Sequence, residues 1–121
     1  MDKLELKQRL KDFAIRIIKM VDSMPRTISA DALARQIIRS GTSPSANYRA
    51  ALLGKSDKDF LNKLKMVEEE LDETLHWIEI IMETEIIPPN RLENLHEECH
   101  ELLKIIVSTI ISMRKRVNMK E

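Results

Sequence analysis

The sequence predicts an all-α protein, an antiparallel up-down-up-down four-helix bundle that forms a single domain over residues 1–121. Three observations support this prediction. Apolar residues recur at steps of three and four in four long runs. Short segments with Pro, Gly or Ser separate the runs. The chain has only 2 Gly, and its apolar content is mostly aliphatic. Long helices joined by short connections pack as antiparallel neighbours.

The first helix is expected over residues 3–23. Its apolar residues share one face because they follow the helical repeat; they are Leu6, Leu10, Phe13, Ile17, Val21 and Met24. Pro25 cannot continue a helix and ends this one.

The second helix is expected over residues 29–53, with Ser29 as its N-cap. Gly41 and Pro44 interrupt its apolar pattern, so the helix either kinks there or ends and restarts. A kink near Gly41–Pro44 is the preferred interpretation, because the apolar residues on both sides stay in phase. Gly54 suits a left-handed C-terminal cap.

The third and fourth helices are expected over residues 57–84 and 90–116. Ser56 and Asp59 resemble a capping box at the start of the third helix. Pro88 and Pro89 break the chain between the two helices, and Asn90 is the expected N-cap of the fourth. Residues beyond 116 are expected to fray.

Basic residues are concentrated in the first half of the chain. Residues 1–56 carry 11 Lys and Arg and 5 Asp and Glu, whereas residues 57–121 carry 9 and 15. One interpretation is that oppositely charged helices pair within the bundle. The other is a basic face that contacts the phosphates of RNA or DNA. The candidate contact residues are Arg16, Lys19, Arg26, Arg35, Arg39 and Arg49, and the tail adds Arg114, Lys115 and Arg116.

Large apolar residues exceed what one helix face requires. Seven of the ten residues from Leu102 to Ile111 are large and apolar. A helix of a single bundle buries one stripe, so the surplus indicates a homo-oligomer; the alternative is that broad stripes fill a thick core. The candidate interface residues are Ile15, Ile18, Trp77, Leu103, Ile105, Val107 and Ile111.

The sequence offers no convincing catalytic or metal site. Pairs such as Glu73 with His76, and Glu97 with His100, have the Glu-x-x-His spacing of di-iron bundles, but they point away from the predicted core stripes. No Gly-rich phosphate loop and no nucleophile–base spacing is present. Cys99, the single cysteine, lies on an apolar stripe and is expected to be a core residue. We therefore expect no cofactor and no enzymatic activity.

The expected location is the cytoplasm. The first residues lack the apolar segment of a secretory signal, and a single Cys fits a reducing compartment. Every apolar run is shorter than the ~20 residues that a membrane span needs, so no membrane partner is expected.

Three short motifs carry a family resemblance. Arg39–Asn47 reads Arg-Ser-Gly-Thr-Ser-Pro-Ser-Ala-Asn, Ser56–Phe60 reads Ser-Asp-Lys-Asp-Phe, and Glu73–Trp77 reads Glu-Thr-Leu-His-Trp. In this order and spacing they resemble the bacterial four-helix bundle family, also called the 23S rRNA intervening-sequence protein or S23-like family. The chain departs from the family after Asn47, where Arg49-Ala50-Ala51 replaces an acidic residue and Gly.

The resemblance implies an up-down bundle, a homopentameric ring and no enzyme activity. Some members are encoded within intervening sequences of rRNA genes, and distant relatives bind nucleic acid and a reverse transcriptase. Arg39, Ser43 and Asn47 lie one turn apart and form a polar cluster, which is either a binding site or a hydrogen-bond network between helices. The favoured function is a homo-oligomeric, RNA-associated accessory protein; the alternative is a protein-interaction scaffold that binds no nucleic acid.

Overall fold

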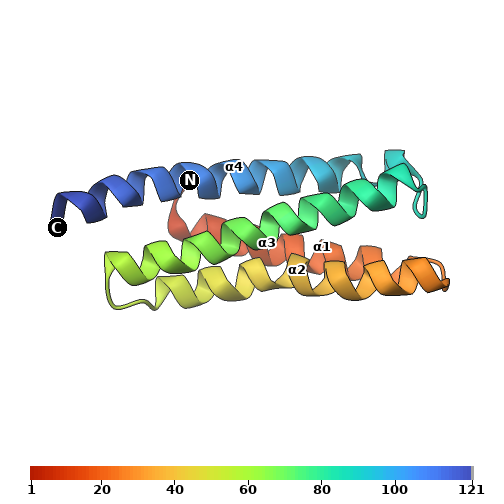
Figure 1. Ribbon diagram of the computed structural model, residues 1–121, viewed down its shortest axis with the longest axis horizontal. Helices are drawn as coiled ribbons and strands as arrows, with labels where there is room; N and C mark the ends of the chain where they lie inside the picture. Colours follow the sequence, from red (N-terminus) through yellow and green to blue (C-terminus); the bar gives the residue numbers. More distant parts are fainter. Residues whose placement is uncertain (121) are drawn as a thin grey trace.

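The computed structural model describes residues 1–120 and shows four long antiparallel helices (Figure 1). They are α1 (Lys3–Asp22), α2 (Ile28–Leu52), α3 (Asp57–Glu83) and α4 (Glu93–Lys120), with a short 3-10 turn, η1 (Pro89–Arg91), before α4. Consecutive helices run in opposite directions, as the sequence predicted for an up-down-up-down bundle.

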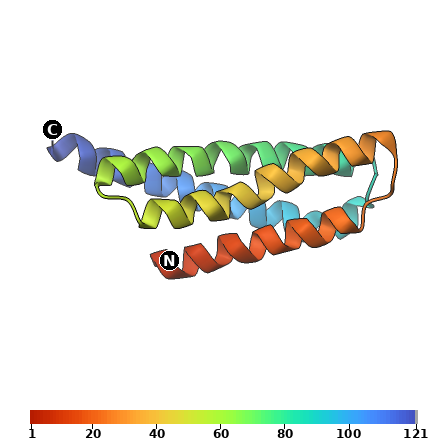
Figure 2. The ribbon, with the colours of Figure 1, turned by 90° about the horizontal axis from the view of Figure 1, so that it is seen from below.

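Each helix packs against the next one along the chain, but the contacts between neighbouring helices differ in extent. The α2–α3 contact is the most extensive, and the α1–α4 contact is by far the smallest. Figure 2, seen from below, shows α1 beside α2 with α4 lying behind them. The α1–α4 side is therefore the loosest seam of the fold.

The core lies on the predicted stripes of all four helices. Its most completely buried large side chains come from every helix; they are Leu10, Phe13, Ile17, Ile37, Tyr48, Leu64, Leu71, Ile78, Ile81, Leu102 and Ile106. The end of the α1 stripe differs slightly from the prediction. Met20 is buried there and Val21 only half-buried, since the step from Ile17 is three residues rather than the predicted four.

Three helices begin with a side-chain cap. The carboxylate of Asp2 accepts from the Glu5 amide at 2.8 Å, and the Ser56 hydroxyl accepts from the Asp59 amide at 3.1 Å. The cap of α2 is Thr27, whose hydroxyl accepts from the Ala30 amide at 3.1 Å. The prediction of Ser29 was wrong by two residues because Thr27 has the same capping chemistry and extended backbone.

α2 is one helix across Gly41 and Pro44. Gly41 is buried against α1, and a Cβ at this position would lie 2.8 Å from Cγ1 of Ile17. The glycine therefore permits α1 and α2 to approach closely at the centre of the bundle. This packing explains why a residue that weakens isolated helices lies inside a long one.

One predicted loop signal behaves differently from expectation. Gly54 does not adopt a left-handed conformation, so it is not the cap that the sequence suggested. The left-handed residue is Glu85, with φ of 56°. Its amide bonds the Met82 carbonyl at 3.1 Å and the Ile86 amide bonds the Ile81 carbonyl at 3.2 Å. This is a Schellman ending of α3 with Glu at the position that usually holds Gly.

α4 is displaced from its predicted bounds at both ends. Asn90 lies in η1 and α4 begins at Glu93, because the prolines before it favour a 3-10 turn. At the other end the helix continues past residue 116, where fraying was expected. Figures 1 and 2 show its last turns running beyond the N-terminal end of α1 and the α2–α3 loop.

No helix in the part of the chain that the structure describes has the length and apolar character that crossing a bilayer requires.

Candidate functional site

Two of the three sequence motifs, Arg39–Asn47 and Glu73–Trp77, meet in space at the seam between α2 and α3. Ser40 of the first motif and Thr74 of the second are both fully buried, and their hydroxyl oxygens lie 2.9 Å apart. The Thr74 hydroxyl also lies 2.7 Å from the Glu70 carbonyl oxygen of its own helix. A hydroxyl pair therefore satisfies the polar atoms inside this seam without water.

A second group of contacts runs along the outer edge of the same seam. Arg39 forms an ion pair with Glu73, and the Trp77 indole N–H donates to Oε2 of that carboxylate at 3.1 Å. One turn further on, the Asn47 side-chain amide donates to Oε1 of Glu70 at 2.6 Å. The Arg39–Glu73 and Asn47–Glu70 contacts join α2 to α3, and the Trp77 indole holds the Glu73 carboxylate.

The polar cluster Arg39, Ser43 and Asn47 therefore does not converge on one point. Arg39 and Asn47 reach different carboxylates of α3, whereas the Ser43 hydroxyl donates to the Arg39 carbonyl oxygen of its own helix at 2.7 Å. This arrangement has the geometry of the hydrogen-bond network between helices. Trp77, a predicted interface residue, belongs to this network and packs partly on the core.

The six predicted nucleic-acid contacts differ in how available they are. Arg26 is paired with Asp31 at 3.0 Å, Arg39 is paired with Glu73, and Arg16 lines a groove with the acidic side chains of α4. Lys19, Arg35 and Arg49 are exposed and have no ion-pair partner within residues 1–119. Three of the six cations are therefore free to meet an anionic partner.

A second basic group lies at the end of the bundle where α4 projects. Lys3, Lys55 and Arg116 line one groove of about 240 Å³. Arg114 and Lys115 are exposed on the same turn of α4 as Arg116. No Asp or Glu occurs between residues 102 and 120. Arg116 contacts Asp57 at 3.1 Å, and Lys3 lies 4.8 Å above the Phe60 ring. We call Lys3, Lys55, Arg114, Lys115 and Arg116 the basic end.

Apolar side chains are exposed on two helices that were predicted to carry surplus apolar surface. Ile15 and Ile18 of α1 are 42% and 40% exposed, and Ile111 of α4 is 52% exposed. Of the other predicted interface residues, Leu103, Ile105 and Val107 are half-buried on α4. The surplus is thus partly used against the core and partly open to solvent.

The histidines and the cysteine have structural surroundings. His96 Nε2 lies 2.9 Å from Oε2 of Glu79, and the His76 ring lies 5.1 Å from that of Trp77. Within residues 1–119, no group of three or more His, Cys, Asp or Glu side chains is placed to hold a metal ion. Burial raises the pKa of the Cys99 thiol to about 12, and the thiol donates to the Leu71 carbonyl oxygen.

Sequence reasoning missed the partners of the motif residues. It placed Glu73 away from the predicted core stripe of its helix and named no partner residue for it, although Glu70, Glu73 and Trp77 follow the helical repeat and share one face of α3. That periodicity was the available signal. The Arg9–Glu98 pair, by contrast, joins residues 89 positions apart and has no local signature.

These features define a class, the all-α up-down bundle whose central seam is fixed by short polar motifs on its second and third helices. The chain belongs to the 23S rRNA-intervening sequence protein family, whose model matches residues 2–108. The resemblance drawn from the motifs is therefore confirmed, and the matched region spans the α2–α3 network and most of α4.

A solved structure supports the same assignment. The chain resembles a crystal structure of a protein with unknown function from the S23 ribosomal protein family of Bacteroides thetaiotaomicron. The two are 33% identical, with a TM-score of 0.84 over 91% of this chain and 98% of the other. A comparison with curated proteins gives no match.

Proposed function

We propose that this protein is a non-enzymatic, homo-oligomeric accessory protein that associates with RNA. The observation that carries the proposal is the basic end, a group of five cations of which three lie on an acid-free stretch of α4, one at the start of α1 and one in the α2–α3 loop beside Asp57. Family membership supports RNA as the anion, because the family takes its name from sequences inserted in 23S rRNA genes.

The geometry of the basic end suits a phosphate backbone rather than unpaired bases. Its cations lie at one end of the bundle, on the last turns of α4, at the start of α1 and in the α2–α3 loop. The aromatic side chain nearest to it, Phe60, is 7% exposed and covered by Lys3. Binding should therefore depend on charge and not on base stacking.

The exposed residues Lys19, Arg35 and Arg49 are the second group that RNA would reach. They remain candidate contacts, as the sequence predicted, but they are spread over two helices, and of the three it is Arg49, in the last turn of α2, that lies on the side of the basic end. Repetition of both groups in an oligomer would turn weak contacts into tight binding.

The non-enzymatic part of the proposal rests on how the titratable groups are used. The buried Cys99 thiol has its pKa raised and points at a backbone carbonyl, which is the opposite of an activated nucleophile. His96, Glu73 and Glu70 are engaged in contacts between side chains. We expect purified protein to act through binding alone.

The experiment that tests RNA association is fluorescence anisotropy with a labelled structured RNA, measured across a salt series. The wild type should bind, and its affinity should fall linearly on a log–log plot of salt concentration. The basic-end variant Lys55→Glu/Arg114→Glu/Lys115→Glu should lose at least about tenfold in affinity, since each lost phosphate contact reduces counterion release.

The matched control is Lys63→Glu/Lys65→Glu/Arg91→Glu, which changes the net charge equally at positions on α3 and η1. It should keep most of the wild-type affinity. A variant with Lys19, Arg35 and Arg49 changed to Glu distinguishes the second group. Absent or salt-independent binding by the wild type would leave the alternative, a protein-interaction scaffold.

The scaffold is favoured by one observation of its own. A groove of about 450 Å³ on the outer face of α4 is lined mainly by apolar atoms of Leu103, Val107 and Ile111. Such a surface is unusual on a monomer and fits a protein partner. Size-exclusion chromatography with light scattering tests both proposals, because each requires an assembly larger than 14.1 kDa.

A further inference from the structure

The groove at the basic end gathers cations from three separate segments of the chain. Lys3 belongs to the start of α1, Lys55 to the α2–α3 loop and Arg116 to the end of α4, yet all three line one hollow of about 240 Å³. Figures 1 and 2 show these three segments at the same end of the bundle. Because the segments are far apart along the chain, the groove exists only in the folded bundle.

Two of these cations are held in place by contacts of their own. The Lys3 ammonium lies over the face of the Phe60 ring, 4.8 Å from its centre, and that ring is buried. Arg116 forms an ion pair with Asp57 through Nε at 3.1 Å, and its guanidinium carries further N–H donors on the Nη atoms. The groove is therefore arranged before a ligand binds, which lowers the entropic cost of binding.

The lining of the groove has an excess of positive charge. Within residues 1–119 it contains three cations and one carboxylate, Asp57, which gives a net charge of +2. Lys3 and Lys55 have no ion-pair partner in that part of the chain. The charge that an incoming anion would meet is thus not already neutralised by the fold.

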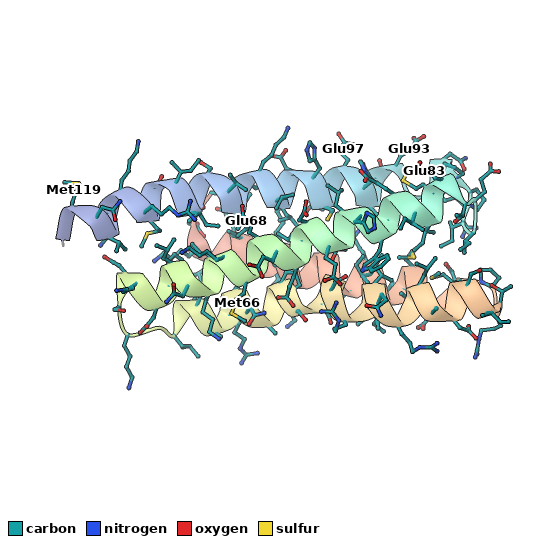
Figure 3. The ribbon with its side chains drawn as sticks, viewed as in Figure 1. Met66, Glu68, Glu83, Glu93, Glu97 and Met119 are labelled. Carbon is teal, nitrogen blue, oxygen red and sulfur yellow. The ribbon has the colours of Figure 1, made fainter. Side chains whose placement is uncertain are left out.

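The carboxylates of α4 lie away from this groove. All acidic residues of α4 within the described chain precede Leu102. Figure 3 shows Glu93 and Glu97 toward the opposite end of the bundle from Met119, which lies in the last turn of α4. The separation of charge along α4 therefore leaves its final turns attractive to an anion.

The size of the groove favours a small anion or the end of a larger one. Its volume of about 240 Å³ is below the range of about 300–1,000 Å³ that is usual for sites of drug-sized ligands. Buried Ala51 and Phe60 form its floor together with half-buried Leu52 and Met113. Ionic contacts beside such an apolar floor are stronger than contacts on an open surface.

The two kinds of phosphate in RNA differ in charge and in shape. A terminal phosphate carries a charge of about −1.5 to −2 at pH 7 and continues into the strand on one side only. An internal phosphate carries about −1, and the strand leaves it on both sides. A terminal phosphate therefore matches the +2 charge of the groove, whereas an internal one would compensate only half of it.

We propose that this groove binds the terminal phosphate of an RNA strand, with Lys3, Lys55 and Arg116 as its contacts. The proposal rests on the RNA association of the proposed function and names the part of the RNA that the basic end recognises. Arg116 can use its Nη atoms for parallel bonds to the phosphate oxygens. Arg114 and Lys115 are exposed outside the groove and contact internal phosphates of the same strand.

The experiment compares three forms of one RNA that differ only at their ends. One form has a 5′-phosphate, one has a 3′-phosphate and one has hydroxyls at both ends, and all carry the fluorescent label on an internal base. In anisotropy titrations, the wild type should bind at least one phosphorylated form about fivefold or more tightly than the unphosphorylated form. The form that binds best identifies the end that the groove accepts.

A pair of variants assigns the preference to the groove. Lys3→Gln/Lys55→Gln should bind all three forms alike, because it removes two contacts to the terminal phosphate. The control Arg114→Gln/Lys115→Gln removes the same charge outside the groove, so it should weaken all three forms equally and keep the preference. Both variants should retain wild-type helicity by circular dichroism.

Three results would overturn the proposal and leave RNA association intact. The first is that the wild type binds all three forms with the same affinity. The second is that the preference survives the loss of Lys3 and Lys55. The third is that the control loses the preference as well, since the total charge of the basic end would then decide it.

If the wild type binds none of the RNAs, the proposed function fails and a small ligand tests the groove by itself. The probes are adenosine 5′-monophosphate and 3′-monophosphate, observed by phosphorus NMR. Broadening of the phosphate signal by the wild type but not by Lys3→Gln/Lys55→Gln would keep the groove as a site for a terminal phosphate. No broadening by the wild type would overturn the groove together with the RNA role.

Discussion

The α2–α3 and α1–α4 seams of this bundle are built in contrasting ways. α2 and α3 are joined by the buried Ser40–Thr74 pair and by the Asn47–Glu70 and Arg39–Glu73 contacts along the edge. α1 and α4 contact each other much less, and there Arg9 donates from Nε to Oε2 of Glu98 at 2.9 Å and from Nη2 to Oε1 at 2.7 Å.

This difference shows which contacts between helices stabilise the fold. The α1–α4 side holds a groove of about 420 Å³ lined by Arg9, Arg16 and the acidic residues of α4, so α1 receives little support from α4. α1 therefore depends on its contact with α2, and α2 in turn is fixed on α3. The fold therefore resembles two packed layers, α1 with α2 and α3 with α4, more than a bundle in which all four neighbouring helix pairs pack equally.

The largest effect should come from separating α1 from α2. Gly41→Val places a side chain where even a Cβ would lie 2.8 Å from Ile17, and overpacking of this kind costs about 2 kcal/mol. Urea denaturation at fixed protein concentration measures the loss. Ala46→Val, exposed on the same helix, should change stability by no more than about 0.5 kcal/mol. Equal losses would contradict the dependence of α1 on α2.

A smaller loss of stability is expected from a substitution inside the α2–α3 seam. Thr74→Val keeps the shape but removes the hydroxyl that pairs with Ser40, so stability should fall by about 1–1.5 kcal/mol. Thr109→Val is the control, because that half-buried hydroxyl bonds only the Ile105 carbonyl of its own helix. If both variants unfold at the same urea concentration, the Ser40–Thr74 pair does not hold the seam.

Substitutions at the α1–α4 seam should destabilise the fold less. Arg9→Ala and Glu98→Ala should each cost less than about 1 kcal/mol, since the pair is 30% and 20% exposed and screened by water. A double-mutant cycle gives their coupling, which should shrink at high salt. A coupling above that of Thr74 with Ser40 would reverse the ranking of the two seams.

The last prediction concerns the chemical reactivity of Cys99 and not the free energy of unfolding. Cys99 should react with iodoacetamide at pH 8 at least about a hundredfold more slowly in the native protein than in urea, because it is buried and a pKa of about 12 leaves little thiolate. If Arg9→Ala speeds this reaction while its urea midpoint is unchanged, α1 opens separately from the rest. Native and unfolded protein reacting alike would contradict the buried placement.

The sequence predicted the helices and their buried stripes well, because periodicity records burial directly. It predicted helix ends poorly. Thr27 and Ser29 offer the same cap, and only the packed chain selects between them. Gly54 is not left-handed because α2 ends with bonds from the Leu53 and Gly54 amides to carbonyls three residues back, whereas the Schellman ending of α3 places Glu85 in the left-handed region.

The candidate site was partly predictable. The motif residues were identified in advance, but not their partners, because Asn47–Glu70 and Arg39–Glu73 depend on how α2 and α3 face each other. The basic end depends on how the end of α4 packs beside Lys3 and Lys55, which lie far from it along the chain. Tertiary arrangement, rather than residue type, decides both features.

α2 cannot be expected to nucleate folding. Gly41 and Pro44 disfavour a helix by about 1 and 3 kcal/mol relative to Ala. The centre of α2 therefore forms only when Ile17 of α1 and the Thr74 hydroxyl of α3 are in place to support it. A peptide of residues 57–83 should show more helix in isolation than one of residues 28–52. The Arg39–Asn47 motif would then take its native shape late in folding, after α3 and α4 have paired to provide a surface on which it can dock.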